Sequence, residues 1–495
     1  MRAHLQIMKL IGLLLLTMLL AGAASPSKLD SYIDAAEGAP AEFAADALIR
    51  IASLDQVPKA RKIQLLDDAF NRAAGAQQPY KRQTAFLHGA GPGGFLNRAY
   101  DQDLDALSLR LRAVEAMLPL DPFRARTLFL QIPPIDAPKL TCADFMVYDF
   151  SRYYAVLESV AAKTFTPKEI QSEEPFALIK SSTAGITSAV QVAPVARLLA
   201  GAKLTNDQFR TLVAQFAASL EKISGDDRSF EFSRGVGTAI QSLAAKSKQN
   251  GVSPLPLLEA YRLYLVNNLS GARCADDDQM QQGHAFAFTT GLPADSEAAN
   301  TIQFFNDKLR VDPLQAVEEQ EVTPASIDGN AKGLNSCDSP ECKTVAAQYR
   351  GMIFGSNGIP YTNAQKSTTE WQSQLQDFIS ALADWKEPSG DETANYFRDK
   401  CGLYSDVFNV VPPGPDRELV LRAMLDFLKQ NRYQTENRME WFLPVNTLIG
   451  RIGLDPLGLG NLAGDVKSVN DPLIALYANL ESLVPRSPAQ IMPLL

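Results

Sequence analysis

The stretch LDALSLRLRAVEAMLPLDPFRARTLFLQ, residues 104–131, decides the fold. Apolar residues follow two sides of a helix in its first half, with Leu104, Leu107, Leu111, Val114 and Leu118 on one side and Leu109, Ala113 and Ala116 on the other. A helix that is apolar on two sides must be covered on two sides. We therefore expect this helix to lie between neighbours.

The second half of the stretch predicts another helix after a tight turn. Pro119 ends the first helix, Asp121 can cap the next one with Pro122 at its first position, and Pro133 ends it. Similar start signals recur along the chain, at Thr141, Thr166-Pro167, Thr205, Ser253-Pro254, Asp312-Pro313, Ser339-Pro340, Ser367 and Asp471-Pro472. Each of them predicts a further helix.

These signals and the apolar spacing predict helices through most of the chain. The predicted ranges are 40–54, 58–75, 101–118, 122–132, 142–162, 167–181, 187–200, 206–224, 227–249, 254–269, 295–310, 340–354, 367–385, 391–410, 416–430, 436–450 and 472–484. Short connections favour antiparallel neighbours. The sequence predicts an all-α fold of stacked antiparallel helical hairpins, similar in class to an α-solenoid or an irregular helical repeat. At most one short strand is expected, at residues 284–290.

The N-terminus has the pattern of a secretory signal peptide. A short basic region is followed by an apolar run and by the small residues that signal peptidase prefers, so we expect cleavage near Ala23 and a secreted or periplasmic protein. We predict a signal peptide at 1–23, a helical-hairpin array at 24–270, a loop-rich break or insertion at 271–339 and a second helical section at 340–495. No membrane span is expected after signal removal.

The charge of the chain argues against nucleic acid as a partner. Removal of residues 1–23 takes away Arg2 and Lys9 but no acid, so the formal net charge falls from −9 to −11. A phosphate backbone requires a basic surface. Basic groups such as Lys59, Arg61 and Lys62 are interpreted as a solvated helix face.

Five cysteines follow the signal segment, at Cys142, Cys274, Cys337, Cys342 and Cys401. Disulfides persist in exported proteins, and an odd number leaves one thiol without a partner in the chain. We prefer a Cys142–Cys274 bridge with one further bridge among the other three, although the sequence does not select a pairing. Zinc binding at Cys337 and Cys342 lacks a second pair of ligands.

Glycine, histidine and calcium motifs give no complete site. Residues 89–94 fit G-x-G-x-x-G, but they lie between two predicted helices and are interpreted as a loop, as is 458–464. His88 and His284 are the histidines of the mature chain, and a disulfide-bonded Cys274 with a loop His284 is preferred to a Cys–His pair. The calcium-like loop from Asp328 has Lys332 and Ser339 where oxygen ligands belong, and a solvated acidic loop is preferred there and at Asp276–Asp278.

Two acidic clusters keep an enzyme as an alternative. Asp226, Asp227 and Glu231 form one, and the other is Asp144 and Asp149 beside Tyr148, Arg152 and Tyr153. A carboxylate pair can hydrolyse glycosides without histidine. The competing interpretation places Asp144, Asp226 and Asp227 in helix first turns and pairs Asp149 with Arg152.

Aromatic residues recur at helical spacing between positions 371 and 385. Trp371, Leu375, Phe378, Leu382 and Trp385 form a seam that is interpreted as buried core rather than a platform for sugars.

The sequence therefore predicts an exported, non-catalytic helical binding or scaffold protein that engages a polypeptide or cell-envelope partner. No catalytic, cofactor-binding or metal-binding residue is assigned. The alternative is a carboxylate-dependent glycan hydrolase with its site in a groove between helical layers. A small-molecule carrier is a third option and would require a closed apolar pocket.

Overall fold

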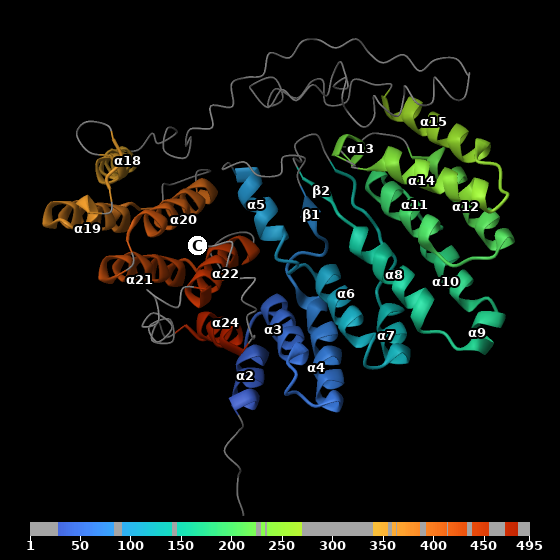
Figure 1. The fold of residues 1–495 in the computed structure, drawn as a ribbon, viewed down its shortest axis with the longest axis horizontal. Coiled ribbons are helices and arrows are strands. Elements are labelled where there is room, and N and C mark those ends of the chain that lie inside the picture. Colours follow the sequence, from blue (N-terminus) through green and yellow to red (C-terminus); the bar gives the residue numbers. More distant parts are fainter. Residues whose placement is uncertain are drawn as a thin grey trace, which may run out of the picture.

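A computed structural model describes residues 28–83, 92–140, 146–223, 229–232, 235–269, 340–354, 359–362, 364–386, 393–412, 414–432, 438–454 and 471–483. Within these residues the fold is all-α, with one small antiparallel sheet (Figure 1). The predicted all-α class is confirmed.

The elements are given in chain order, with short 3-10 helices marked η. They are α2 (Lys28–Glu37), α3 (Ala41–Ser53), α4 (Lys59–Arg72), η1 (Ala73–Gly75), β1 (Arg82–Gln83), α5 (Pro92–Tyr100), α6 (Ala106–Met117), α7 (Pro122–Phe129), β2 (Val147–Tyr148), α8 (Ser151–Lys163), α9 (Pro167–Gln171), α10 (Glu174–Ser182), η2 (Ala189–Gln191), α11 (Val192–Gly201), α12 (Asn206–Leu220), α13 (Ser229–Phe232), α14 (Val236–Gln249) and α15 (Leu255–Leu269). The second section contains α18 (Pro340–Ile353), η3 (Gln365–Ser367), α19 (Thr369–Asp384), α20 (Thr393–Val410), α21 (Pro415–Gln430), α22 (Arg438–Leu454) and α24 (Pro472–Leu483).

Helix α6 lies between neighbours, as its two apolar sides predict. It packs against α3 and α4 on one side and against α7 and α8 on the other. Leu107 and Leu111 from one side and Leu109 and Ala113 from the other are all buried. The next helices continue the row, because α8 contacts α11, α11 contacts α14, and α12 contacts α15.

Several predicted helix starts are confirmed by their caps. The carboxylate of Asp121 accepts a hydrogen bond from the amide of Arg124, with Pro122 in the first turn. Thr166 and Thr205 each form a reciprocal capping box, with Glu169 and Gln208. Asp471 accepts from the amides of Leu473 and Ile474 at the start of α24.

The predicted helix 142–162 begins too early. Residues 147–148 form strand β2, which pairs with β1 through Arg82 and Tyr148, so the described residues contain two short strands where the sequence predicted none. Helix α8 starts only at Ser151, whose amide donates to the side chain of Asp149. The predicted strand at 284–290 lies outside the described residues. Helices α2 and α5 were not predicted.

Several other boundaries differ from the prediction, and three of them have a clear local cause or cap. The range 167–181 is divided into α9 and α10 at Glu173, whose φ of 58° lies in the left-handed region. Thr368, and not Ser367, caps α19 by accepting from the amide of Trp371. Helix α22 continues to Leu454, beyond its predicted end at 450.

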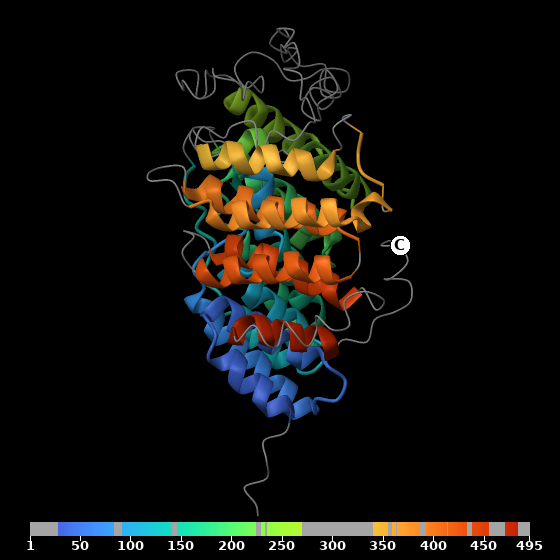
Figure 2. The same cartoon turned by 90° about the vertical axis from the view of Figure 1, so that its left-hand side faces the viewer.

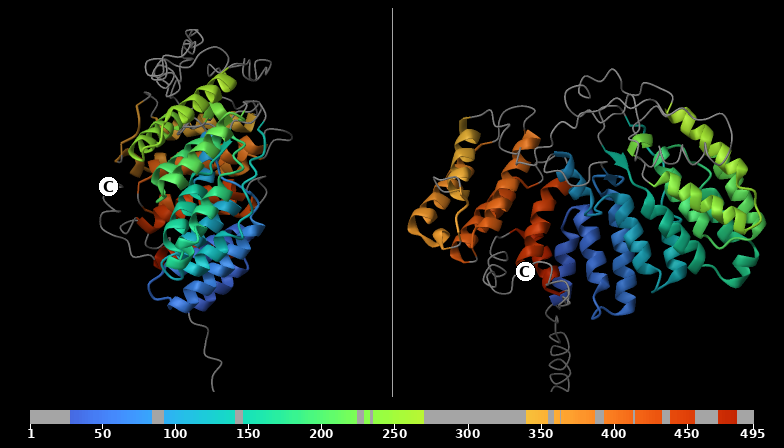
Figure 3. Two further views of the ribbon diagram at one scale, coloured as in Figure 1. Left: turned by 90° about the vertical axis from the view of Figure 1, so that its right-hand side faces the viewer. Right: turned by 45° about the horizontal axis from the view of Figure 1, so that its top comes forward.

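The C-terminal section joins the first helices of the chain. Helix α24 packs against α2 and α3, and α22 packs against α5. In space, α18 to α21 therefore come first, followed by α22 and α24 and then by the N-terminal row (Figure 1). The helices of the C-terminal section lie one beside another in Figure 2, and the whole row is curved in Figure 3.

Aromatic packing fills this junction. The Phe43 ring of α3 lies 4.9 Å from the Phe442 ring of α22, and the Phe442 ring lies 4.4 Å from the Tyr477 ring of α24, measured between centroids. All three side chains are buried, and one core cluster includes residues of both sections. In the part of the chain that the structure describes, no helix combines the length and the apolar character that crossing a membrane requires.

Candidate functional site

A cavity of about 220 Å³ opens between α6, α8 and the segment that leads into β1. Its polar lining comes from Lys81, Asp103, Ser108, Asp149, Ser151 and Arg152, and its apolar lining from Leu107, Leu111 and Tyr153. The cavity is thus mixed in character, unlike the closed apolar pocket that a carrier would require.

Backbone hydrogen bonds position the two edges of the cavity. The amide of Ala106 donates to the carbonyl of Gln78 at 2.8 Å, which fixes the extended segment before β1 against the start of α6. The amide of Asp149 donates to the carbonyl of Lys81 at 3.0 Å, continuing the pairing of β1 with β2. Lys81 and Asp149 therefore lie side by side although they are far apart in the sequence.

Charges of alternating sign line one wall. Lys81 Nζ lies 2.9 Å from Asp103 Oδ1, and Arg152 Nη1 lies 2.7 Å from Asp103 Oδ2. Arg152 Nε lies 3.0 Å from Glu115 Oε2. Burial lowers the pKa of Lys81, but its hydrogen bond to Asp103 and the nearby charges of Asp103, Asp149 and Asp101 raise it above the usual value overall. The Lys81 ammonium is therefore retained at neutral pH.

Asp103 pairs with both cations of this wall, and its own backbone is constrained. Its φ of 54° lies in the left-handed region, which aspartate tolerates better than most residues. Its amide donates to the carbonyl of Tyr100, and its own carbonyl accepts from Arg112 Nη1 at 3.3 Å. The position of its carboxylate is set before any ligand arrives.

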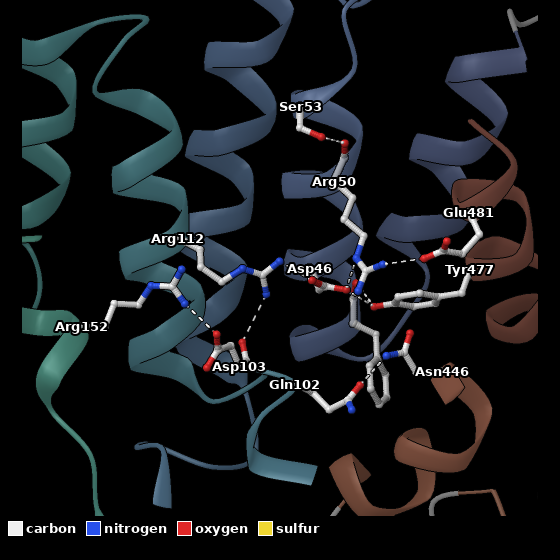
Figure 4. A network of polar contacts seen from close by, with 11 residues as sticks. Asp46, Arg50, Ser53, Gln102, Asp103, Arg112, Arg152, Asn446, Tyr477 and Glu481 are labelled. Atoms are coloured by element: carbon white, nitrogen blue, oxygen red, sulfur yellow. Dashed lines mark hydrogen bonds and ion pairs between the residues drawn. The ribbon is translucent and has the colours of Figure 1, made fainter. Parts of the chain in front are cut away.

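Arg112 connects the cavity wall to the junction of the two sections (Figure 4). Its other terminal nitrogen pairs with the buried carboxylate of Asp46 in α3. Asp46 also pairs with Arg50 at 2.9 Å. Burial raises the pKa of Asp46, but the positive charges of Arg50 and Arg112 outweigh this effect and hold the pKa below its usual value. Asp46 is therefore a carboxylate at neutral pH.

Asp105, beside the cavity, is a buried acid with a structural role. It caps α6 by accepting a hydrogen bond from the amide of Ser108 at 2.9 Å, and the whole residue is 0% exposed. Its Oδ1 has no hydrogen-bond partner among the described residues. Burial raises the pKa of Asp105 to about 6.

The second predicted acidic cluster is partly brought together. Asp149, Arg152 and Tyr153 line the cavity, whereas Tyr148 packs against Phe150 and Arg82. The predicted pairing of Arg152 with Asp149 is wrong, because Arg152 reaches Asp103 and Glu115 instead. Asp144, Asp226, Asp227 and the side chain of Glu231 lie outside the described residues.

The glycine motif differs from its predicted loop. Helix α5 begins at Pro92, so Pro92, Gly93 and Gly94 belong to the first turn of a helix. Strand β1 precedes the motif, but it pairs antiparallel with β2, and a dinucleotide fold needs a parallel sheet. Residues 89–91, His88, His284, the loop from Asp328, Asp276–Asp278 and 458–464 lie outside the described residues.

The structure describes the bonding state of two of the five cysteines. Cys401 is a free, buried thiol, so it does not belong to the second predicted bridge. Cys342 is disulfide-bonded to a partner outside the described residues, and no disulfide joins two described cysteines. Cys142, Cys274 and Cys337 lie outside the described residues, and the preferred Cys142–Cys274 bridge stays a prediction.

The aromatic seam of α19 is core, as predicted. Trp371, Leu375, Phe378, Leu382 and Trp385 are all buried, and the Trp371 indole donates to the carbonyl of Met352 at 3.0 Å. A platform for stacking sugars would need exposed rings.

Sequence reasoning missed Lys81 and Asp103 as members of the site. Asp103 was placed inside a helix predicted from residue 101, whereas α6 starts after its cap at Asp105. Lys81 lies two residues after Pro79, and this proline was the one available sign of an extended segment.

No protein-family model, no curated protein and no solved structure matches this chain.

Proposed function

We propose that the chain is an exported, non-catalytic helical binding or scaffold protein that engages a polypeptide or cell-envelope partner. Export rests on the signal-like residues 1–23. A binding role is supported by the curved row of helices, because such rows present extended surfaces to partners (Figure 3).

The observation that carries the proposal is the pairing of the charged side chains at the cavity. Asp103 is held by Lys81 and Arg152, and Glu115 is held by Arg152. A general acid needs a raised pKa and access to its substrate. The acid beside the cavity with a raised pKa, Asp105, is buried as a helix cap. This arrangement favours recognition over proton transfer.

A glycan hydrolase is the second candidate, and one observation favours it. Asp103 and Asp149, from separate segments, line the same cavity. Glycosidases place two carboxyl groups about 5–9.5 Å apart on either side of the bond that they cleave. In this candidate, Asp149 would act beside Asp103, which pairs with Lys81 and Arg152.

Cross-linking from the cavity tests the leading proposal. A photoreactive amino acid replaces the exposed Ser151 in the full mature chain, and the control replaces the exposed Thr211 on α12. With a cell-envelope extract we expect the Ser151 position to cross-link one defined polypeptide that the Thr211 position does not.

Activity assays separate the two candidates. The wild-type protein and Asp149→Asn are each incubated with a panel of glycans. The asparagine keeps an oxygen that can accept a hydrogen bond from the Ser151 amide. We expect no turnover by either protein. Turnover that Asp149→Asn abolishes would establish the hydrolase instead, and identical cross-links from both positions would remove the cavity from partner binding.

A further inference from the structure

Two polar atoms at the cavity remain free to bind a ligand. Arg152 uses Nε for Glu115 and Nη1 for Asp103, and no described residue accepts a hydrogen bond from its Nη2. Asp149 uses Oδ1 to accept from the amide of Ser151, and no described residue donates to its Oδ2. The cavity thus offers one cationic donor and one anionic acceptor from two of its lining residues.

The balance of charge selects the kind of ligand. Among the residues that line the cavity, Lys81 and Arg152 contribute two positive charges, and Asp103 and Asp149 contribute two negative ones. Glu115, behind Arg152, adds a negative charge outside the lining. An anion would be repelled by two carboxylates, and a cation would be repelled by an ammonium and a guanidinium. A ligand with one charge of each sign can satisfy both free atoms.

The size of the cavity restricts the ligand further. A volume of about 220 Å³ holds about seven water molecules at the ~30 Å³ that each occupies in the liquid. Sites for drug-sized ligands begin at about 300 Å³. Leu107, Leu111 and the ring of Tyr153 complete the lining and can contact an aliphatic group. The space fits a molecule of amino-acid size.

We propose that this cavity binds a small zwitterion of the α-amino-acid class, with its carboxylate on Nη2 of Arg152 and its ammonium on Oδ2 of Asp149. Lys81 and Asp103 stay paired and hold Arg152 in position. The left-handed backbone of Asp103 agrees with a wall arranged before binding. The proposal goes beyond the function proposed above, since it requires no macromolecular partner.

Calorimetry with three matched probes tests the class of ligand. L-leucine carries both charges, N-acetyl-L-leucine carries only the negative one, and L-leucinamide carries only the positive one. On the full mature protein we expect saturable binding of leucine, with each derivative at least ~10-fold weaker, because each leaves one charged group of the site without a partner.

Two variants assign the ends of the ligand. Asp149→Asn retains an oxygen that can accept from the Ser151 amide and removes the charge, so we expect leucine to bind ~10-fold more weakly and N-acetyl-leucine to bind no more weakly than before. Arg152→Gln is expected to weaken leucine and N-acetyl-leucine alike. The control is Arg210→Gln, which removes an exposed arginine paired with Asp207 on α12 and should change neither affinity.

Circular dichroism and thermal unfolding of each variant identify any loss of folding. With folding intact, three results would overturn the proposal: no binding of leucine to the wild type, equal binding of leucine and its acetyl derivative, or leucine affinity unchanged in both cavity variants. A partner cross-linked from Ser151 without leucine binding would reject the zwitterion site and leave the proposed function standing.

Discussion

The hydroxyl of Tyr477 donates a 2.8 Å hydrogen bond to Oδ2 of Asp46, across a separation of 431 residues. Tyr477 lies in α24 and Asp46 in α3, and both are fully buried. Burial and the negative charge of Asp46 raise the pKa of the Tyr477 hydroxyl well above its usual value, so it remains a donor. This contact ties the last described helix to one of the first.

Removal of that hydroxyl should weaken the junction without altering its shape. We expect Tyr477→Phe to lower the free energy of unfolding by about 1–2 kcal/mol, because a hydrogen bond to a buried carboxylate is lost while Arg50 and Arg112 still pair with Asp46. Urea unfolding followed by circular dichroism measures the change. Tyr361→Phe is the control, since no described residue hydrogen-bonds to that hydroxyl. An equal, negligible effect of both variants would mean that the bond contributes nothing.

Most of the described helices were predictable because local residues determine them. Apolar spacing in residues 104–131 and the caps at Asp121, Thr166 and Thr205 act within one or two turns of the chain. The start of α8 was missed because β2 forms only through its pairing with β1, which lies far back in the sequence. Such pairing leaves no periodic signal in two residues.

The charged groups were harder to predict for the same physical reason. Asp46 appears in the sequence as one acid on an alanine-rich helix, and its partners come from α6 and α24. Arg126 appears in the sequence as one of two arginines in a short helix, yet it is buried, pairs with Glu169 at 2.7 Å and lies 4.3 Å from the centroid of the Phe165 ring. Only tertiary packing brings these partners within reach.

Asp105 should make stability depend on pH in the acidic range. Burial raises its pKa from 3.8 in the unfolded chain to about 6 in the fold, so folding is favoured while the group is protonated. This contribution is fully present below about pH 4 and is lost as the pH rises through about 6. In Asp105→Asn, which can still cap α6, we expect the free energy of unfolding relative to wild type to increase by about 2–3 kcal/mol between pH 4 and pH 7.

The matched control for Asp105 is Asp121→Asn. Asp121 caps α7 in the same way, through the amide of Arg124, but it is partly exposed. Urea unfolding at pH 4, 5, 6 and 7 measures all three proteins. If the difference between Asp105→Asn and wild type stays constant over this range, Asp105 ionises normally in the folded protein.

Lys400 should produce the opposite dependence at alkaline pH. The residue as a whole is 3% exposed. Its ammonium donates to the carbonyl of Trp385 at 2.8 Å and to the Tyr396 hydroxyl at 3.0 Å, and it lies 4.7 Å from the centroid of the Phe427 ring. These three groups are neutral. Burial, with the nearby charge of Lys386, lowers the pKa of Lys400 from 10.5 to about 8.

The unfolded chain therefore binds more protons than the fold between pH 8 and 10.5, and stability gains from this group as the pH rises through that window. We expect the stability of Lys400→Met relative to wild type to fall by about 2 kcal/mol between pH 7 and pH 10, because the wild type is relieved of its buried charge and the methionine variant has none to lose. Lys366→Met is the control, since the half-buried Lys366 also donates to a helix-terminal carbonyl, that of Val410. Unfolding in urea at both pH values gives the comparison. Parallel pH profiles for wild type and Lys400→Met would show that Lys400 keeps its ordinary pKa and that hydrogen bonds and the aromatic rings fully replace its water.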